Sequence, residues 1–264
     1  MKSFRHFAFL TVKIVFSVAL VVLTGIFVLP GCSSAEKKAD ASTPEGSYKL
    51  GEEFEKDERF EEAVARFAEV KNKHPYSRFA TLSELKIADI QFKRENFIEA
   101  QNAYQLFKDF HPKHPQIDYV TFRLALSYFN QLPSTIDRDL ALAEKSILSF
   151  DETMSSYPNS TYVAEAREKK QAALKMLAEK ELYVAAFYVR HEKYDSALRR
   201  FEGVLKTYPN VGFDAQALFG AAHSAFEIGE KERAEQHAKN LYRLFPDSGE
   251  AKRAKNEFGK YGAA

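Results

Sequence analysis

The sequence predicts an all-α solenoid in which about five helix–turn–helix repeats stack along the chain. Two observations carry this prediction: a spacing of small and aromatic residues that returns along the chain, and a proline-containing connector after each occurrence. In the first occurrence Ala63 is followed four residues later by Phe67 and eight residues after that by Pro75. The same spacing is found in Ala100, Tyr104 and Pro112, and again in Ala197, Phe201 and Pro209.

The repeat period indicates the kind of solenoid. Ala63 and Ala100 are 37 residues apart, and so are Pro75 and Pro112. A helix pair of this length, in which a small residue meets an aromatic one, is typical of the tetratricopeptide repeat (TPR), whose usual period is about 34 residues. We therefore expect TPR units that wind into a right-handed superhelix.

The connectors between repeats stop one helix and start the next. A proline cannot continue the helix before it, and a following serine can cap the helix after it. The first connector has this form, with Pro75 followed by Ser77. Related connectors lie later in the chain: YPNS at 157–160, YPN at 208–210 and FPDS at 245–248.

These stops predict where the helices lie. The third repeat carries an insertion, 130–138, rich in turn residues, after which we expect Asp139 to begin the second helix of that repeat. The other expected elements are repeat one over 47–73 with its turn at 57–59, repeat two over 78–111, a helix from about Ile117, a long helical run over 162–181, repeat five over 213–245 and a capping helix over 250–261.

The N-terminus has the layout of a secretory leader. A basic segment covers 1–13, apolar residues cover 14–29, and the motif Leu29-Pro30-Gly31-Cys32 follows. This motif resembles a bacterial lipobox, although Pro30 stands where a small or β-branched residue is usual. The resemblance implies cleavage before Cys32 and acylation of Cys32 with S-diacylglycerol and N-palmitoyl groups. The alternative is an uncleaved anchor, for which the apolar run is short, because a membrane-spanning helix needs about 20 residues.

Four segments are expected: a signal peptide (1–31), a lipidated cysteine with a flexible tether (32–47), N-terminal TPR repeats one to three (48–160), and C-terminal TPR repeats four and five with the capping helix (161–264). The tether has no large apolar side chain and cannot form a core. Cys32 is the only cysteine, which excludes an intramolecular disulfide. The formal net charge of +1 gives no reason to expect nucleic acid as a partner.

The candidate partner-binding residues lie at two positions of each repeat's first helix that the packing pattern leaves free. Large apolar side chains gather at these positions, and exposed apolar patches usually mark binding sites. The alternative is that neighbouring helices bury these rings, because aromatic residues at helical spacing are often core. The candidates are Tyr48, Glu55, Leu85, Phe92, Phe122, Phe129, Phe219 and Phe226.

The sequence offers no enzyme chemistry. No glycine-rich phosphate loop, GxSxG elbow or HExxH motif occurs. His111 and His114 lie close together in a connector, but no further ligand completes a metal site there, so a solvated loop is the better interpretation. We therefore expect no catalytic residues, no metal and no cofactor other than the covalent lipid.

The lipobox, the short polar tether, five TPR units and the insertion in the third unit together resemble the BamD family of outer-membrane lipoproteins. The resemblance covers the chain from Cys32 to the C-terminus. It implies a location on the periplasmic face of the outer membrane, within the β-barrel assembly (BAM) machinery. The implied partners are a BamA-like barrel protein through its POTRA domains, other BAM lipoproteins and unfolded outer-membrane proteins.

The resemblance also divides the molecule by role. It implies that the N-terminal repeats, with Phe92, Phe122 and Phe129, form the substrate-facing pocket, and that repeats four and five contact the scaffold subunit. The alternative function is that of another envelope TPR protein, such as a Tol–Pal or cell-division coordinator or a secretin pilotin. Tol–Pal coordinators carry a coiled-coil segment before their repeats, whereas only the tether is available here.

Overall fold

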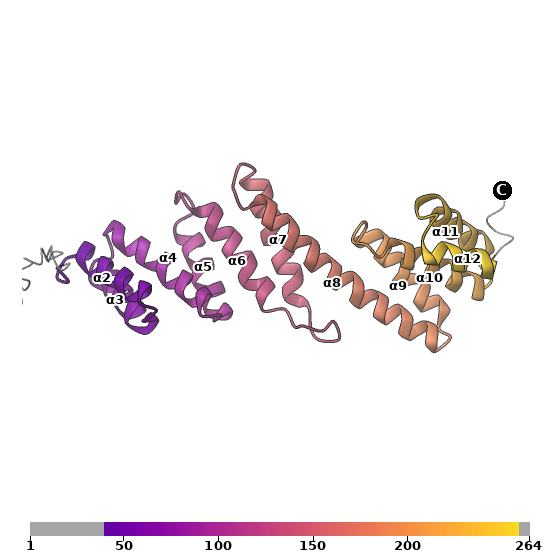
Figure 1. The fold of residues 1–264 in the computed structure, drawn as a ribbon, viewed down its shortest axis with the longest axis horizontal. Coiled ribbons are helices and arrows are strands. Elements are labelled where there is room, and N and C mark those ends of the chain that lie inside the picture. Colours follow the sequence, from indigo (N-terminus) through magenta and orange to yellow (C-terminus); the bar gives the residue numbers. More distant parts are fainter. Residues whose placement is uncertain (1–39, 259–264) are drawn as a thin grey trace, which may run out of the picture. The chain divides into compact units, whose positions relative to one another are not determined.

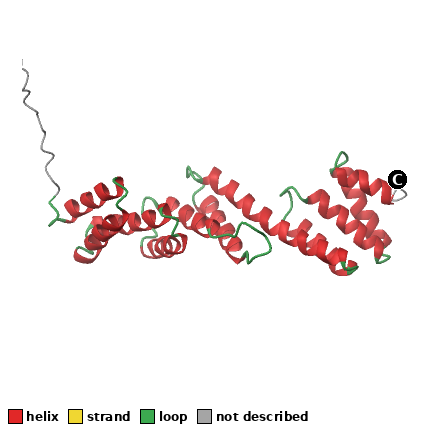
Figure 2. Ribbon diagram, turned by 60° about the horizontal axis from the view of Figure 1, so that its bottom comes forward, coloured by secondary structure: helices red, strands yellow, loops and turns green. Residues whose placement is uncertain are grey.

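A computed structural model of the protein describes residues 40–258, and within this range every regular element is a helix (Figures 1 and 2). The leader, Cys32 and the tether as far as residue 39 lie outside the described residues, and residues 44–47 of the predicted tether belong instead to the first helix, α2. The helices are α2 (Pro44–Lys56), α3 (Phe60–Lys73), α4 (Arg78–Lys93), α5 (Phe97–Phe110), α6 (Ile117–Asn130), α7 (Ala141–Ser156), α8 (Val163–Arg190), α9 (Tyr194–Thr207), α10 (Asp214–Glu227), α11 (Lys231–Leu244) and α12 (Gly249–Phe258).

Packing follows the order of the chain. Each helix from α2 to α12 packs against the helix before it and the helix after it. Beyond these neighbours, contacts are made between helices two apart, such as α2 with α4 and α10 with α12. This pattern confirms the predicted stack of helix pairs, and the right-handed sense of its superhelix stays a prediction.

The turns within repeats lie where the sequence places them. The first covers 57–59, between α2 and α3. Its residue Glu58 has a positive φ of 59°, and the residue one period later, Glu95, has a φ of 61°. Glu192 repeats this conformation with a φ of 56°. The left-handed residue lets the backbone reverse over only three residues before the second helix begins.

The connectors also behave as predicted. Ser77 precedes α4, and its hydroxyl oxygen accepts a hydrogen bond from the Phe79 N–H at 3.1 Å. One prediction is wrong: α7 begins at Ala141 and not at Asp139. The Asp139 carboxylate instead accepts a hydrogen bond from the Ala141 N–H at 2.9 Å, so Asp139 acts as a polar cap in front of the helix.

The core of each unit is an aromatic side chain of the second helix set against small residues. Phe67, Tyr104, Phe150 and Phe201 are buried, and so are the alanines three or four residues before them where these occur. In the third unit Ser146 takes the place of the alanine and is fully buried. Its hydroxyl donates a hydrogen bond to the Ala143 carbonyl at 2.8 Å, which satisfies the polar atom inside the core.

Helix α8 is the longest element and joins the two groups of repeats. It has 28 residues, covers nearly all of the run predicted over 162–181 and continues to Arg190, and it packs against both α7 and α9. Its exposed faces carry charged side chains. Within residues 40–258 no helix combines the length and the apolar character that crossing a membrane requires.

Candidate partner-binding grooves

The larger opening among the N-terminal repeats is a polar and aromatic groove, called here the N-terminal groove. Its volume is about 530 Å³. The first helices of repeats one to three, α2, α4 and α6, supply most of its wall, and the turn after α4 closes one end. The lining residues are Glu55, Asp89, Phe92, Lys93, Glu95, Phe97, Tyr119, Arg123 and Asn130.

A half-buried carboxylate organises the base of this groove. Asp89 in α4 accepts hydrogen bonds from the hydroxyl groups of Tyr104, at 2.6 Å, and Tyr119, at 2.8 Å. The Arg123 Nε donates to the Tyr104 oxygen at 3.3 Å. Four side chains from α4, α5 and α6 are thus joined in one network, which fixes the relative positions of these helices where the groove lies.

The surroundings of Asp89 change its acidity. Burial raises the pKa of the Asp89 carboxyl above its ordinary value, while the hydrogen bonds from Tyr104 and Tyr119 and the charge of Arg123 oppose this effect. Burial also raises the pKa of both tyrosines, so their hydroxyl groups stay protonated and act as donors. The base of the groove therefore presents two neutral phenols around one carboxylate.

Arg123 also covers an aromatic ring. Its guanidinium carbon lies 3.7 Å from the centre of the Phe92 ring, a cation–π contact. Phe92 also makes an edge-to-face contact with Phe97, with the ring centres 5.2 Å apart. Phe92 is half-buried, so part of its ring remains available at the groove surface.

The contact between Arg123 and Phe92 has a counterpart one repeat earlier, in which the partner of the cation is a carboxylate instead of a ring. Lys86 stands 37 residues before Arg123, and Glu55 stands 37 residues before Phe92. Lys86 forms an ion pair with Glu55 at 2.9 Å and lies 3.9 Å from Glu52, which is the counterpart of Asp89. Lys86 in α4 and Arg123 in α6 thus occupy one register. Each lies close to the same two positions of the first helix in the preceding repeat, Glu52 and Glu55 in α2 and Asp89 and Phe92 in α4.

A third contact continues this series. Lys169 in α8 lies 5.8 Å from the centre of the Phe129 ring, and Phe129 stands 37 residues after Phe92. Phe129 is half-buried and also meets the edge of Phe150, with ring centres 6.3 Å apart. Each of the first helices α4, α6 and α8 therefore carries a cation that lies against a carboxylate or a ring of the preceding first helix, although Phe129 and Lys169 lie outside the lining of the N-terminal groove.

Three of the predicted groove residues are instead buried in the core. Tyr48 meets the rings of Phe67 and Phe79, with centres 5.3 and 5.5 Å apart. Phe122 stacks on Tyr162 at 5.0 Å. Leu85 is equally buried, at 4% exposure. Tyr48, Leu85 and Phe122 are therefore core residues and not free groove residues. They share one position of the repeat, and side chains at this position fill the space between consecutive first helices.

A second groove, called here the C-terminal groove, lies among α8, α10 and α12 and has a volume of about 320 Å³. Phe219 is half-buried in its wall, and the Arg253 guanidinium carbon lies 4.4 Å from the centre of that ring. Leu182, Val189 and Phe201 add apolar surface to the wall. Phe226, the last of the predicted residues, is outside this lining and is 38% exposed.

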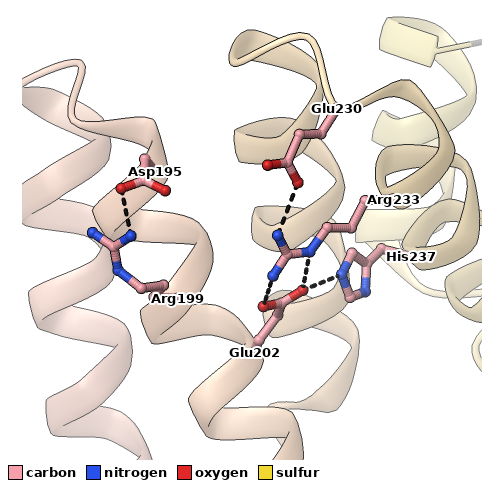
Figure 3. Close-up of polar contacts among 6 residues, drawn as sticks. All are labelled: Asp195, Arg199, Glu202, Glu230, Arg233 and His237. Atoms are coloured by element: carbon pink, nitrogen blue, oxygen red, sulfur yellow. Dashed lines mark hydrogen bonds and ion pairs between the residues drawn. The ribbon is translucent and has the colours of Figure 1, made fainter.

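A polar cluster joins α9 to α11 (Figure 3). Glu202 of α9 receives two hydrogen bonds from the Arg233 guanidinium and lies 2.9 Å from the His237 Nε2. Glu230 accepts a further hydrogen bond from Arg233 at 2.8 Å. Burial works against ionisation of Glu202, but the hydrogen bonds from Arg233 and His237 outweigh it and hold the pKa of this carboxyl below its ordinary value.

His111 is hydrogen-bonded to a carboxylate of helix α4. Its Nε2 lies 2.8 Å from a carboxylate oxygen of Glu84, so this connector histidine is held against α4 and is not simply solvated. His114 packs its ring against the edge of Phe107, with centres 5.1 Å apart. Over residues 40–258 no group of three or more His, Cys, Asp or Glu side chains gathers as metal ligands would.

Sequence reasoning missed Asp89, Tyr119 and Arg123 as groove residues and Tyr104 as the buried partner of Asp89. The 37-residue period contains a pattern from which Asp89 and Arg123 could have been predicted. Lys86 and Arg123 share one register, and Glu52 and Asp89 share another, so an opposite-charge pair recurs between consecutive repeats. The two tyrosine hydroxyl groups have no such signal, because their roles depend on how α5 and α6 approach α4.

A family model described as "Outer membrane lipoprotein" (YfiO) matches residues 40–254. Among curated proteins, the chain is similar to the outer membrane protein assembly factor BamD of Caulobacter vibrioides, with 27% identity covering 82% of this chain and 72% of the relative. It is 26% identical to the BamD of Rickettsia prowazekii, over 84% of this chain and 88% of the relative. The BamD of Xylella fastidiosa is 28% identical, over 86% and 82%.

Among solved structures, the TPR2AB domain of yeast Sti1 in complex with a pHSP90 segment aligns with a TM-score of 0.46 and 13% identity, covering 84% of this chain and 88% of that one. A TPR protein of Thermus thermophilus aligns with a TM-score of 0.38 and 11% identity, over 83% and 98%.

Proposed function

Because this chain belongs to the YfiO family of outer membrane lipoproteins, we propose that it acts as an assembly factor for outer membrane proteins, as its BamD relatives are named. The observation that carries the proposal is the family match, which covers residues 40–254 and so includes every helix pair of the stack. In this function the chain is a non-enzymatic, lipid-anchored scaffold of a BAM complex, with Cys32 as the lipidated residue.

The N-terminal groove is the proposed site for segments of unfolded outer-membrane proteins. An extended polypeptide offers backbone polar groups and apolar side chains together. The groove offers contacts for both, since Phe92 supplies a partly exposed ring while Glu55 and Arg123 supply polar groups that are already held in place. Preorganised side chains lose little freedom on binding, which favours a partner that arrives disordered.

The C-terminal repeats are the proposed contact for the POTRA region of a BamA-like barrel protein. The C-terminal groove is smaller and more apolar, with Phe219 under Arg253 at its wall. Assigning the two partners to separate repeats lets both bind at once, as a scaffold requires. Other BAM lipoproteins complete the proposed complex. No specific observation favours a Tol–Pal coordinator, a cell-division coordinator or a secretin pilotin.

Substrate binding is tested with Phe92→Glu. The fold should tolerate this change, because the preceding repeat already has a glutamate at this register, Glu55, paired with the corresponding cation. Crosslinking of an unfolded outer-membrane protein to a photoreactive residue placed at Lys93 should fall strongly, since the ring at the groove surface is lost. The measurement is crosslink yield, with helical content checked by circular dichroism.

The matched control is Ile98→Glu, which adds the same charge to a side chain that is 60% exposed and outside the groove lining. It should leave the crosslink yield unchanged. An undiminished yield in folded Phe92→Glu, or an equal loss in both variants, would count against the N-terminal groove as the substrate site.

Scaffold binding is tested with Arg253→Glu, which reverses a charge on the C-terminal groove without removing buried volume. We expect it to reduce capture of a BamA-like POTRA fragment and to leave substrate crosslinking at the N-terminal groove intact. Phe92→Glu should show the opposite pattern. If Arg253→Glu retains full POTRA capture, the contact lies elsewhere on the chain.

A further inference from the structure

One edge of the first two repeats combines the start of the folded region with two exposed aromatic residues. The helices of a TPR unit alternate in direction, so the beginnings of α2 and α4 and the ends of α3 and α5 share an edge. Tyr48, near the start of α2, has its ring centre 5.5 Å from that of Phe79, near the start of α4. We call this the connector edge and define it by Lys71, Tyr76, Phe110 and Lys113.

The aromatic residues of the connector edge are exposed to an extent that packing does not explain. Tyr76 is 102% exposed and Phe110 is 74% exposed. Neither ring has an aromatic partner among the residues the structure describes. Exposed rings grouped in this way mark a surface that something else covers.

The charges beside these rings point to the kind of surface that covers them. Lys71 and Lys113 are exposed and form no ion pair within residues 40–258, whereas nearby Lys73 is paired with Glu69 at 2.6 Å. Uncompensated lysines next to aromatic side chains suit the headgroup layer of a phospholipid bilayer, where rings enter the interface and ammonium groups meet phosphates.

Chain connectivity places this edge near a membrane. The inference rests on the proposed function in one respect, namely that Cys32 carries the lipid. Only residues 33–43 separate Cys32 from the first helical residue, Pro44. Because an extended chain spans at most about 3.6 Å per residue, the start of α2 stays within roughly 40 Å of the bilayer. The connector edge contains the start of α2, which is where this short link joins the folded chain.

We propose that the connector edge of repeats one and two rests on the phospholipid surface to which the lipid anchors the chain. Tyr76 and Phe110 enter the headgroup region, and Lys71 and Lys113 lie against lipid phosphates. This second contact stops the anchored chain from turning freely about its tether. The N-terminal groove, built on the same helices, is then held at a fixed orientation to the membrane.

The chain contains no tryptophan, so single tryptophans report on this contact without background. We would prepare Tyr76→Trp and Phe110→Trp in the full-length lipidated protein and reconstitute each into vesicles of phosphatidylethanolamine and phosphatidylglycerol. The matched control is Ile98→Trp, on an exposed site at the other end of α5, about 18 Å from position 110 by helical rise.

Brominated phospholipids should quench the tryptophans at 76 and 110 and shift their emission to shorter wavelength, while the tryptophan at 98 stays unquenched. Adding Lys71→Glu and Lys113→Glu to Tyr76→Trp should weaken the quenching in vesicles with phosphatidylglycerol more than in vesicles without it. Equal quenching at all three positions, or none at 76 and 110, overturns the proposal.

The acylation state separates failure of this inference from failure of the proposed function. Mass spectrometry of the purified chain shows whether Cys32 carries lipid. An acylated, vesicle-bound chain whose tryptophans at 76 and 110 are unquenched refutes the edge contact and leaves the lipoprotein assignment standing. A chain without lipid refutes the anchor, and the edge contact with it.

Discussion

At the scale of single residues, two glycines within helices face opposite surroundings. A methyl group added at Gly220 in α10 would stand 2.4 Å from the Cζ atom of Phe201. A methyl group added at Gly203 in α9 would have no neighbouring atom within 4 Å. Glycine is unfavourable in any helix interior, so packing requires the first glycine and nothing in the contacts requires the second.

These two positions predict opposite effects of one substitution. Gly220→Ala should lower the free energy of unfolding by about 1–3 kcal/mol, because α9 and α10 must move apart to admit the methyl group. Gly203→Ala should raise it by about 0.5–1 kcal/mol through helix propensity. Urea unfolding followed by circular dichroism measures both, and equal stability of Gly220→Ala and the wild type would disprove the packing requirement.

Single residues also show how far the candidate site could be predicted. The sequence leaves open whether the candidate rings are exposed or packed, and Phe92 and Phe129 are half-buried and keep some exposed surface. Phe122 does not, since a large ring at its position fills the space between consecutive first helices, where it stacks on Tyr162. The spacing of residues along one helix predicts which face of the helix a side chain lies on. It does not predict how closely the neighbouring helix approaches that face.

At the scale of elements, helix boundaries were predictable because each is set by a local device. Proline in the connectors and the left-handed turn residues Glu58 and Glu95 act within a few residues of chain. The start of α7 was misplaced because Asp139 suits both a first helical residue and a cap. The Asp89 network could not be predicted in full, because its phenols come from α5 and α6 and meet only in the assembled stack.

The contact between α9 and α11 supplies a pH-dependent prediction. The pKa of the Glu202 carboxyl is lowered in the folded chain, so its contribution to stability is present above the ordinary carboxyl pKa and is lost as the pH falls through the folded value. Glu202→Gln should therefore destabilise the protein by about 1–2 kcal/mol near pH 7. The difference should shrink as the pH falls below about 4.5.

The control for this prediction lies on the same helix (Figure 3). Asp195 pairs with Arg199 within α9, and both side chains are more than half exposed. Asp195→Asn should change stability by less than about 0.5 kcal/mol, because exposed ion pairs contribute little. Thermal unfolding at pH 7 and pH 4 compares the variants. A Glu202→Gln effect that is the same at both values would show that charge is not its cause.

At the scale of the whole stack, stability is distributed over contacts between successive helices. Such a chain behaves as a one-dimensional array, in which each unit is stabilised by its neighbours. Helix α8 is the continuous link between the N-terminal and C-terminal repeats, because one end packs on α7 and the other on α9. Cooperativity between the two groups of repeats should therefore depend on the middle of α8.

Glu179→Pro tests this dependence at an exposed site in α8. A proline inside a helix costs about 3 kcal/mol or more and interrupts its hydrogen bonding. We expect two unfolding transitions in the variant, one for each group of repeats, where the wild type and the control Glu179→Ala show one. Differential scanning calorimetry provides the measurement. A single transition in Glu179→Pro would mean that other contacts couple the two groups.

Lys86 and Arg123, the cations that contact the preceding first helix, have a consequence for how the sequences of such proteins can diverge. Lys86 meets a carboxylate at Glu55, Arg123 meets a ring at Phe92, and the backbone around each is the same. A single substitution at the position of Glu55 and Phe92 therefore exchanges a charged side chain for an aromatic one and leaves the packing of the helices intact. The chemistry of this surface can therefore differ from one repeat to the next while the packing of the first helices stays the same.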